Sequence, residues 1–250
     1  MADFKTHITT STVLGAGYAA AGFFYFELPI ESCLIAGGLC SVAGMLPDLD
    51  SDSGRPVHEI TSFAAAGVPM LMLERFDMLG WTRETTSLVS VLMYLVIRFG
   101  VGELFKRYTV HRGMWHSLPA CITCGLLTFL AVSGQDLGIR LFKSAGTMVG
   151  FMSHLVLDEI WSFSLKSGRL NIKRSFGTAI KFLGDKTWPN YAAYAVMLVS
   201  GVFAVGDPML MENLGYENRF GEQTAQEVLD KAMRLAGLGT GPQDSTPLQR

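Results

Sequence analysis

Histidine and aspartate residues stand together where several apolar stretches of this 250-residue chain begin or end. His154 and Asp158 are four residues apart in an apolar stretch, so on a helix both side chains point to the same side. Burying such an ionisable pair is costly unless its members are paired or face a cavity. A divalent metal bound by imidazole nitrogen and carboxylate oxygen removes that cost, and a buried hydrogen bond between the two residues is the alternative.

Two further pairs flank other apolar stretches. Asp48 and Asp50 follow a proline, which predicts a turn where both carboxylates converge, although aspartate is also common in turns that bind nothing. His111 and His116 are separated by a glycine, which predicts His111 in a loop and His116 in the first turn of a helix. The alternative is two unconnected histidines. Taken together, the three pairs offer nitrogen and oxygen ligands of the kind that hold two or more metals with open positions and activate water.

The elements that position these pairs are strongly apolar. Hydrophobic residues make up 49% of the chain and charged residues only 17%, against roughly 25% charged residues in ordinary soluble domains. Apolar stretches occur at residues 12–26, 32–46, 60–73, 86–97, 117–133, 144–157 and 191–206. A membrane-spanning helix needs about 20 residues, and several stretches are shorter. We therefore predict an all-α, multi-spanning transmembrane helical bundle of about five to seven helices.

The chain divides by character into two parts. Residues 1–206 form the predicted membrane-embedded domain, and residues 207–250 form a polar tail. Within the tail, 222–236 predicts a short amphipathic helix and 237–250 predicts disorder. The net charge of −2 and the absence of a basic face give no support for nucleic-acid binding. No glycine-rich nucleotide-binding motif follows a strand, so no nucleotide cofactor is expected.

The distribution of lysine and arginine predicts an orientation. If all seven stretches cross the membrane, one side receives most of the basic residues up to Lys186, and the other side receives only Arg75, Arg83, Arg140 and Lys143. The positive-inside rule then places the larger group and the amino terminus in the cytoplasm. All five histidines, including His58, fall on that side. The expectation is a protein of the bacterial inner-membrane type with its site on the cytoplasmic face.

Four short motifs follow one another along residues 5–180: His7, Pro47-Asp48-x-Asp50, His111-Arg112-Gly113-x-x-His116-Ser117 and Gly150-x-x-x-His154-x-x-Leu157-Asp158. In their order and intervals they resemble the YdjM-like family of membrane-bound metal-dependent hydrolases. The resemblance implies that metal is bound by six residues: His7, Asp48, His111, His116, His154 and Asp158. It implies that Asp50 binds metal or orients a ligand, and it assigns no role to His58. A distant relation to the zinc phospholipase C and single-strand nuclease superfamily further implies one to three divalent ions, zinc first and manganese second.

These observations lead to the hypothesis of a membrane hydrolase that cleaves a phosphoester, in a small molecule or a lipid head group, with metal-activated water. Asp50 or Glu159 would relay the proton, and Arg112 would stabilise the anion. The expected partners are the lipid bilayer and the phosphoester substrate. The alternative is a non-catalytic metal-binding or transport membrane protein, which the position of the ligands at the ends of stretches disfavours. In a third hypothesis the histidines only tie helices together, which metal content would distinguish.

Overall fold

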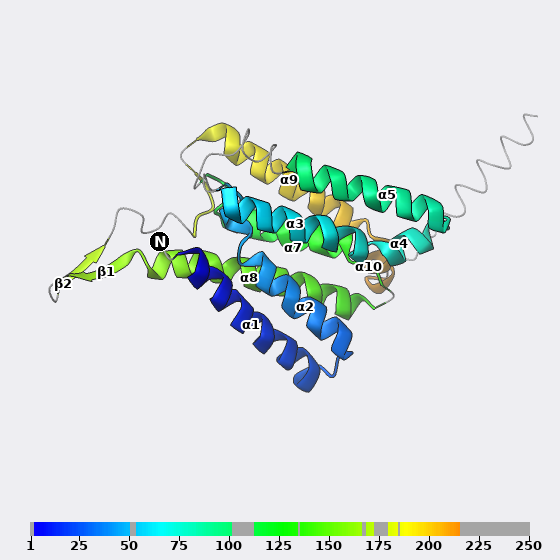
Figure 1. The fold of residues 1–250 in the computed structure, drawn as a ribbon, viewed down its shortest axis with the longest axis horizontal. Helices are drawn as coiled ribbons and strands as arrows, with labels where there is room; N and C mark the ends of the chain where they lie inside the picture. The colour runs from blue at the N-terminus through cyan, green and yellow to red at the C-terminus, as the bar shows by residue number, and fades with distance from the viewer. Residues whose placement is uncertain are drawn as a thin grey trace, which may run out of the picture. The chain divides into compact units, whose positions relative to one another are not determined.

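The computed structural model describes residues 3–50, 54–101, 113–134, 136–166, 169–172, 180–184 and 186–215. The helices are α1 (Phe4–Tyr25), α2 (Ile30–Ala43), the 3-10 helix η1 (Leu46–Asp50), α3 (Gly54–Leu71), α4 (Leu73–Met78), α5 (Arg83–Leu95), the π-helix η2 (Val96–Val101), α7 (Leu118–Ala131), α8 (Leu137–Ile160), α9 (Thr187–Val205) and α10 (Pro208–Asn213) (Figure 1). The predicted helical class is thus confirmed. One feature was not predicted, the antiparallel hairpin of β1 (Phe163–Lys166) and β2 (Arg169–Ile172).

The start of α1 is fixed by a side-chain cap four residues before the first histidine. The carboxylate of Asp3 accepts a hydrogen bond of 2.9 Å from the backbone N–H of Thr6 and another from the Thr6 hydroxyl. These hydrogen bonds from Thr6 hold the pKa of Asp3 below its ordinary value. Because the cap sets the first turn of the helix, it also sets the position of His7 one turn later.

Glycines bring α1, α2 and α8 into close contact, and the three helices lie together in Figure 1. A Cβ atom on Gly15 of α1 would lie 2.4 Å from the carbonyl oxygen of Gly37 on α2. A Cβ atom on Gly150 of α8 would lie 1.9 Å from the carbonyl oxygen of Cys40, also on α2. Backbones that approach this closely are typical of helices packed in lipid. The contact at Gly150 matters for the site because His154 follows one helical turn later.

The predicted number of membrane spans is not confirmed. Among the described residues, one helix is long and apolar enough to cross a membrane by length and composition, the 19-residue α9. The helices α2 and α7 are apolar but have 14 residues each. The helices α1 and α8 have 22 and 24 residues, but polar side chains lie within them, including His7, His154 and Asp158. Large apolar side chains are nevertheless exposed on α1, α5 and α9, among them Phe24, Leu88 and Val202.

At the amino-terminal end of α8 the structure corrects the predicted topology. Arg140 and Lys143 were expected in a loop, but both lie in α8 and both are buried. The Arg140 guanidinium donates hydrogen bonds of 3.0 Å to the carbonyl of Val132 and 3.1 Å to that of Phe129, and it lies over the Phe129 ring. It therefore satisfies carbonyl groups at the carboxyl end of α7, where a helix leaves them without partners.

The chain consists of two compact units, Met1–Val205 and Gly206–Arg250. Among the described residues, the first unit contains the helices that precede α10 and the hairpin. The described part of the second unit contains α10. The amphipathic helix predicted at 222–236 lies outside the described residues.

Candidate metal centre

Five of the predicted ligands come together at one place in the first unit. They arrive from four segments: His7 from α1, Asp48 from η1, His116 from the residues before α7, and His154 and Asp158 from α8. The donor atoms of His7, His154 and Asp158 all lie within 4.8 Å of one another, and so do those of Asp48, His116 and His154. Because His154 belongs to both groups, the five residues form a single cluster.

The separations within the cluster are longer than ordinary hydrogen bonds. His7 Nε2 lies 3.4 Å from Asp158 Oδ1, and His154 Nε2 lies 3.7 Å from Asp48 Oδ1 and 4.0 Å from Asp158 Oδ2. An N–H···O hydrogen bond spans roughly 2.7–3.2 Å. Two ligand atoms on a tetrahedral zinc ion, each about 2.1 Å from the metal, are about 3.4 Å apart. The spacing therefore fits donor atoms that share an ion better than donor atoms bonded to each other.

Burial makes such an ion energetically favourable. His7, His116, His154 and Asp158 are each at most 3% exposed. His154 Nε2 and His7 Nδ1 are buried and have no hydrogen-bond partner among the described residues. Buried carboxylates and polar nitrogens are costly unless a counter-charge or a hydrogen bond compensates them. A divalent cation would supply that compensation, so the residues present fit a metal.

The orientation of His154 is set by the end of α2. Its Nδ1 donates a hydrogen bond of 2.8 Å to the carbonyl oxygen of Gly44, the residue that caps the carboxyl end of α2. A ring that donates through Nδ1 has its free lone pair on Nε2, the atom that faces Asp48 and Asp158. Metal-binding histidines characteristically donate their other ring nitrogen to a backbone carbonyl or a carboxylate in this way.

His116 lies just before α7 and not in its first turn, contrary to the prediction. The hydroxyl of Ser117 accepts the backbone N–H of Ala120, so Ser117 is the cap and the helix begins at Leu118. Trp115, the residue before His116, donates its indole N–H to the carbonyl of Leu46 at 2.6 Å. The sequence motifs assigned no role to Trp115, although it directly precedes His116. It connects the segment that carries His116 to η1, which carries Asp48.

A family model described as YdjM inner membrane protein matches residues 1–170. The chain belongs to this family. The resemblance inferred from the four motifs is thereby confirmed, and the matched region contains all five residues of the cluster. No curated protein and no solved structure matches the chain.

Four predicted residues of this YdjM-family protein have positions outside the cluster or outside the described residues. His111 and Arg112 lie outside the described residues, as does the side chain of Asp50, whose backbone ends η1. Glu159 follows Asp158 on α8 and is half-buried, but it belongs to neither group of potential ligands in the described part of the chain. The roles predicted for these four residues remain predictions.

Another histidine of the YdjM-family chain, His58, lies apart from the cluster. His58 is exposed on α3, and its Nε2 accepts a hydrogen bond from the guanidinium of Arg98 on η2. No group of potential metal ligands in the described residues includes it. His58 is therefore a natural control residue for experiments on the metal centre.

Proposed function

We propose that this YdjM-family protein is a membrane-bound metal-dependent hydrolase that cleaves a phosphoester, in a small molecule or a lipid head group. The observation that carries the proposal is the convergence of three histidines and two aspartates from four separate segments. Zinc is the first choice of metal and manganese the second. Such an ion lowers the pKa of a bound water towards about 7 and neutralises charge that develops on the substrate.

The chemical types of the ligands favour a catalytic site over a structural one. Structural zinc sites are usually closed by four cysteine or histidine ligands, whereas catalytic sites combine histidine with carboxylate and keep a position open. All four cysteines are buried in helices, and none belongs to the ligand groups of the described residues. The cluster is thus a nitrogen and oxygen site.

One ligand is more accessible than the others. The side chain of Asp48 is 13% exposed, against 2% for His7, 0% for His154 and 1% for Asp158. Water and substrate would therefore reach the metal from the side of η1. In this proposal Asp50 or Glu159 relays the proton and Arg112 stabilises the anion.

The proposed setting is a bundle that crosses the inner membrane several times and holds the metal centre on its cytoplasmic side. The exposed apolar side chains of α1, α5 and α9 support contact with lipid. The excess of lysine and arginine on one side supports the orientation. Reporter fusions after residues 55, 107 and 173 test it, and an external location for any of the three would overturn it.

Activity is tested with the full-length protein purified in detergent, with and without Zn²⁺ or Mn²⁺. The substrates are phospholipids, generic phosphodiesters and single-stranded nucleic acid, and the variants are Asp48→Asn and His116→Ala. His58→Ala is the matched control, because it removes an imidazole outside the cluster. We expect turnover by the wild type and by His58→Ala, and its loss in the two cluster variants.

Other outcomes identify the competing hypotheses. Bound metal without turnover would favour a metal-binding or transport protein. Absence of stoichiometric metal, together with unchanged stability of His154→Ala, would overturn both hypotheses that involve a metal. Turnover that is equal in wild type and cluster variants would overturn the catalytic proposal.

A further inference from the structure

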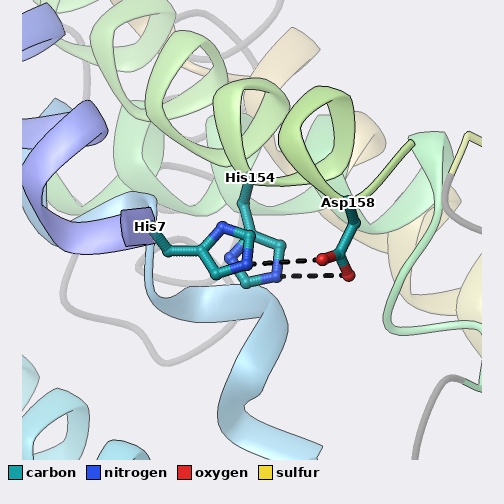
Figure 2. Close-up of side chains that lie close together, drawn as sticks. All are labelled: His7, His154 and Asp158. Atoms are coloured by element: carbon teal, nitrogen blue, oxygen red, sulfur yellow. Dashed lines mark ion pairs between the residues drawn. The ribbon is translucent and has the colours of Figure 1, made fainter. Parts of the chain in front are cut away.

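The imidazole rings of His7 and His154 stack face to face. Their centroids are 3.7 Å apart and their planes differ by 12° (Figure 2). The lone pair of a ring nitrogen lies in the plane of the ring, so a bound metal lies close to that plane. Two nearly parallel planes at this spacing do not meet near the donor nitrogens. A single ion therefore cannot lie in the planes of both His7 and His154.

His116 has a different relation to His154. The centroids of these two rings are 5.6 Å apart and their planes differ by 68°, so the planes intersect. Asp48 Oδ1 lies 3.7 Å from His154 Nε2, and the donor atoms of Asp48, His116 and His154 lie within 4.8 Å of one another. These three residues can therefore direct their donors at one ion.

The carboxylate of Asp158 is divided between the two stacked rings. Its Oδ1 lies 3.4 Å from His7 Nε2, and its Oδ2 lies 4.0 Å from His154 Nε2. Figure 2 shows the two contacts side by side, one from each ring to one oxygen. A carboxylate that presents a different oxygen to each of two ligands is placed to bridge two ions. The ring spacing of 3.7 Å also falls within the separation of about 3.5–4 Å found between the ions of two-metal sites.

We propose that the cluster is a two-ion centre bridged by Asp158. Asp48, His116 and His154 hold the first ion and His7 contributes to the second, while each oxygen of Asp158 is directed at one of the two. The assignment rests on the metal binding of the proposed function, but it does not require hydrolysis. It gives His7 and His154, which lie in contact, different roles.

The test uses the full-length protein in detergent, stripped of metal and then saturated with Mn²⁺. Elemental analysis gives the number of ions per chain, and electron paramagnetic resonance shows whether two manganese ions are coupled through a bridge. We expect two coupled ions in the wild type and in the His58→Ala control. His7→Ala and His116→Ala should each retain one ion and lose the coupled signal. Asp158→Asn, which keeps the shape of the side chain, should lose the coupled signal as well.

The wild-type measurement decides the proposal even if a variant fails to fold. One ion per saturated chain, or two ions without coupling, would overturn it. A folded His7→Ala chain that keeps two coupled ions would also overturn it. Two coupled ions in a protein without hydrolytic activity would support the two-ion centre and overturn the proposed function. Hydrolysis by a protein that binds one ion would support the proposed function and overturn the two-ion centre.

Discussion

The Nδ1 atom of His154 donates a hydrogen bond of 2.8 Å to the backbone carbonyl of Gly44, and this contact joins the candidate metal centre to the end of α2. The acceptor is a main-chain atom, so no side-chain substitution removes it directly. What maintains the contact is the distance between α8 and α2, which depends on Gly150 one turn before His154. Packing between two helices thus determines the direction of the ring nitrogen that we propose binds the metal.

Gly150→Ala tests this dependence. The added Cβ would lie 1.9 Å from the carbonyl oxygen of Cys40, and neither atom belongs to a flexible side chain. Overpacking of this kind costs about 1–3 kcal/mol. We expect a lower unfolding temperature in detergent and weaker binding of Zn²⁺, because the separation of the helices moves His154 away from Gly44.

Gly38→Ala is the control, since a Cβ at this α2 position meets nothing within 4 Å. It should leave Zn²⁺ affinity unchanged and raise helix stability by up to about 1 kcal/mol. Equal Zn²⁺ affinities in Gly150→Ala and the wild type would contradict the role given to this contact.

The local part of the site was predictable from the sequence. His154 and Asp158 share a face because the helical period places residues four apart on one side, and the structure has both buried in the cluster. The stacking of His7 on His154 was not predictable, because it depends on how α1 packs against α8. The predicted number of spans is not confirmed for a related reason: buried polar residues such as Arg140 lie inside the long helices and not between them.

The start of α7 shows a further limit of prediction from local sequence patterns. The glycine before His116 suggested a helix beginning near that histidine, but Ser117 competes for the cap and moves the first helical residue to Leu118. The bond from Trp115 to Leu46 joins residues 69 positions apart in the chain. Local sequence patterns carry no information on a contact over that separation.

Trp115→Phe tests whether this contact positions Asp48 relative to His116. Phenylalanine keeps an aromatic ring beside Phe151, which Trp115 contacts edge to face, but it cannot donate to Leu46. Loss of a supporting hydrogen bond around a metal site typically costs 10- to 100-fold in affinity. We expect Zn²⁺ affinity to fall by about 10-fold, while the loss of the hydrogen bond lowers the free energy of unfolding by about 1 kcal/mol.

Trp188→Phe makes the same substitution at a residue of α9 that is 76% exposed. It should leave both Zn²⁺ affinity and stability at the wild-type level. The positioning role of Trp115 would be rejected if its variant bound Zn²⁺ as tightly as the Trp188 variant does.

Arg140→Met tests the opposite end of α8. The substitution keeps an unbranched side chain but removes the donors to the carbonyls of Phe129 and Val132. Leaving buried acceptors without partners costs about 1–3 kcal/mol, so the unfolding temperature should fall. Zn²⁺ affinity should stay unchanged, because Arg140 belongs to neither ligand group. Arg83→Met, at an exposed position, is the control and should change neither the unfolding temperature nor the Zn²⁺ affinity. A large loss of Zn²⁺ binding in Arg140→Met would contradict the prediction and show that the two ends of α8 are coupled.

Removal of metal should destabilise the folded protein. A ligand that binds only the native state adds about 2.7 kcal/mol when its free concentration is 100 times its dissociation constant. Addition of Zn²⁺ to stripped wild-type protein should therefore raise the unfolding temperature, and a chelator should reverse the rise. His154→Ala should respond less than the wild type, because it lacks one of the buried donor atoms of the cluster. His58→Ala should respond as the wild type does, since its imidazole contacts Arg98 on the surface. An equal rise in His154→Ala and His58→Ala would place the bound zinc elsewhere on the chain.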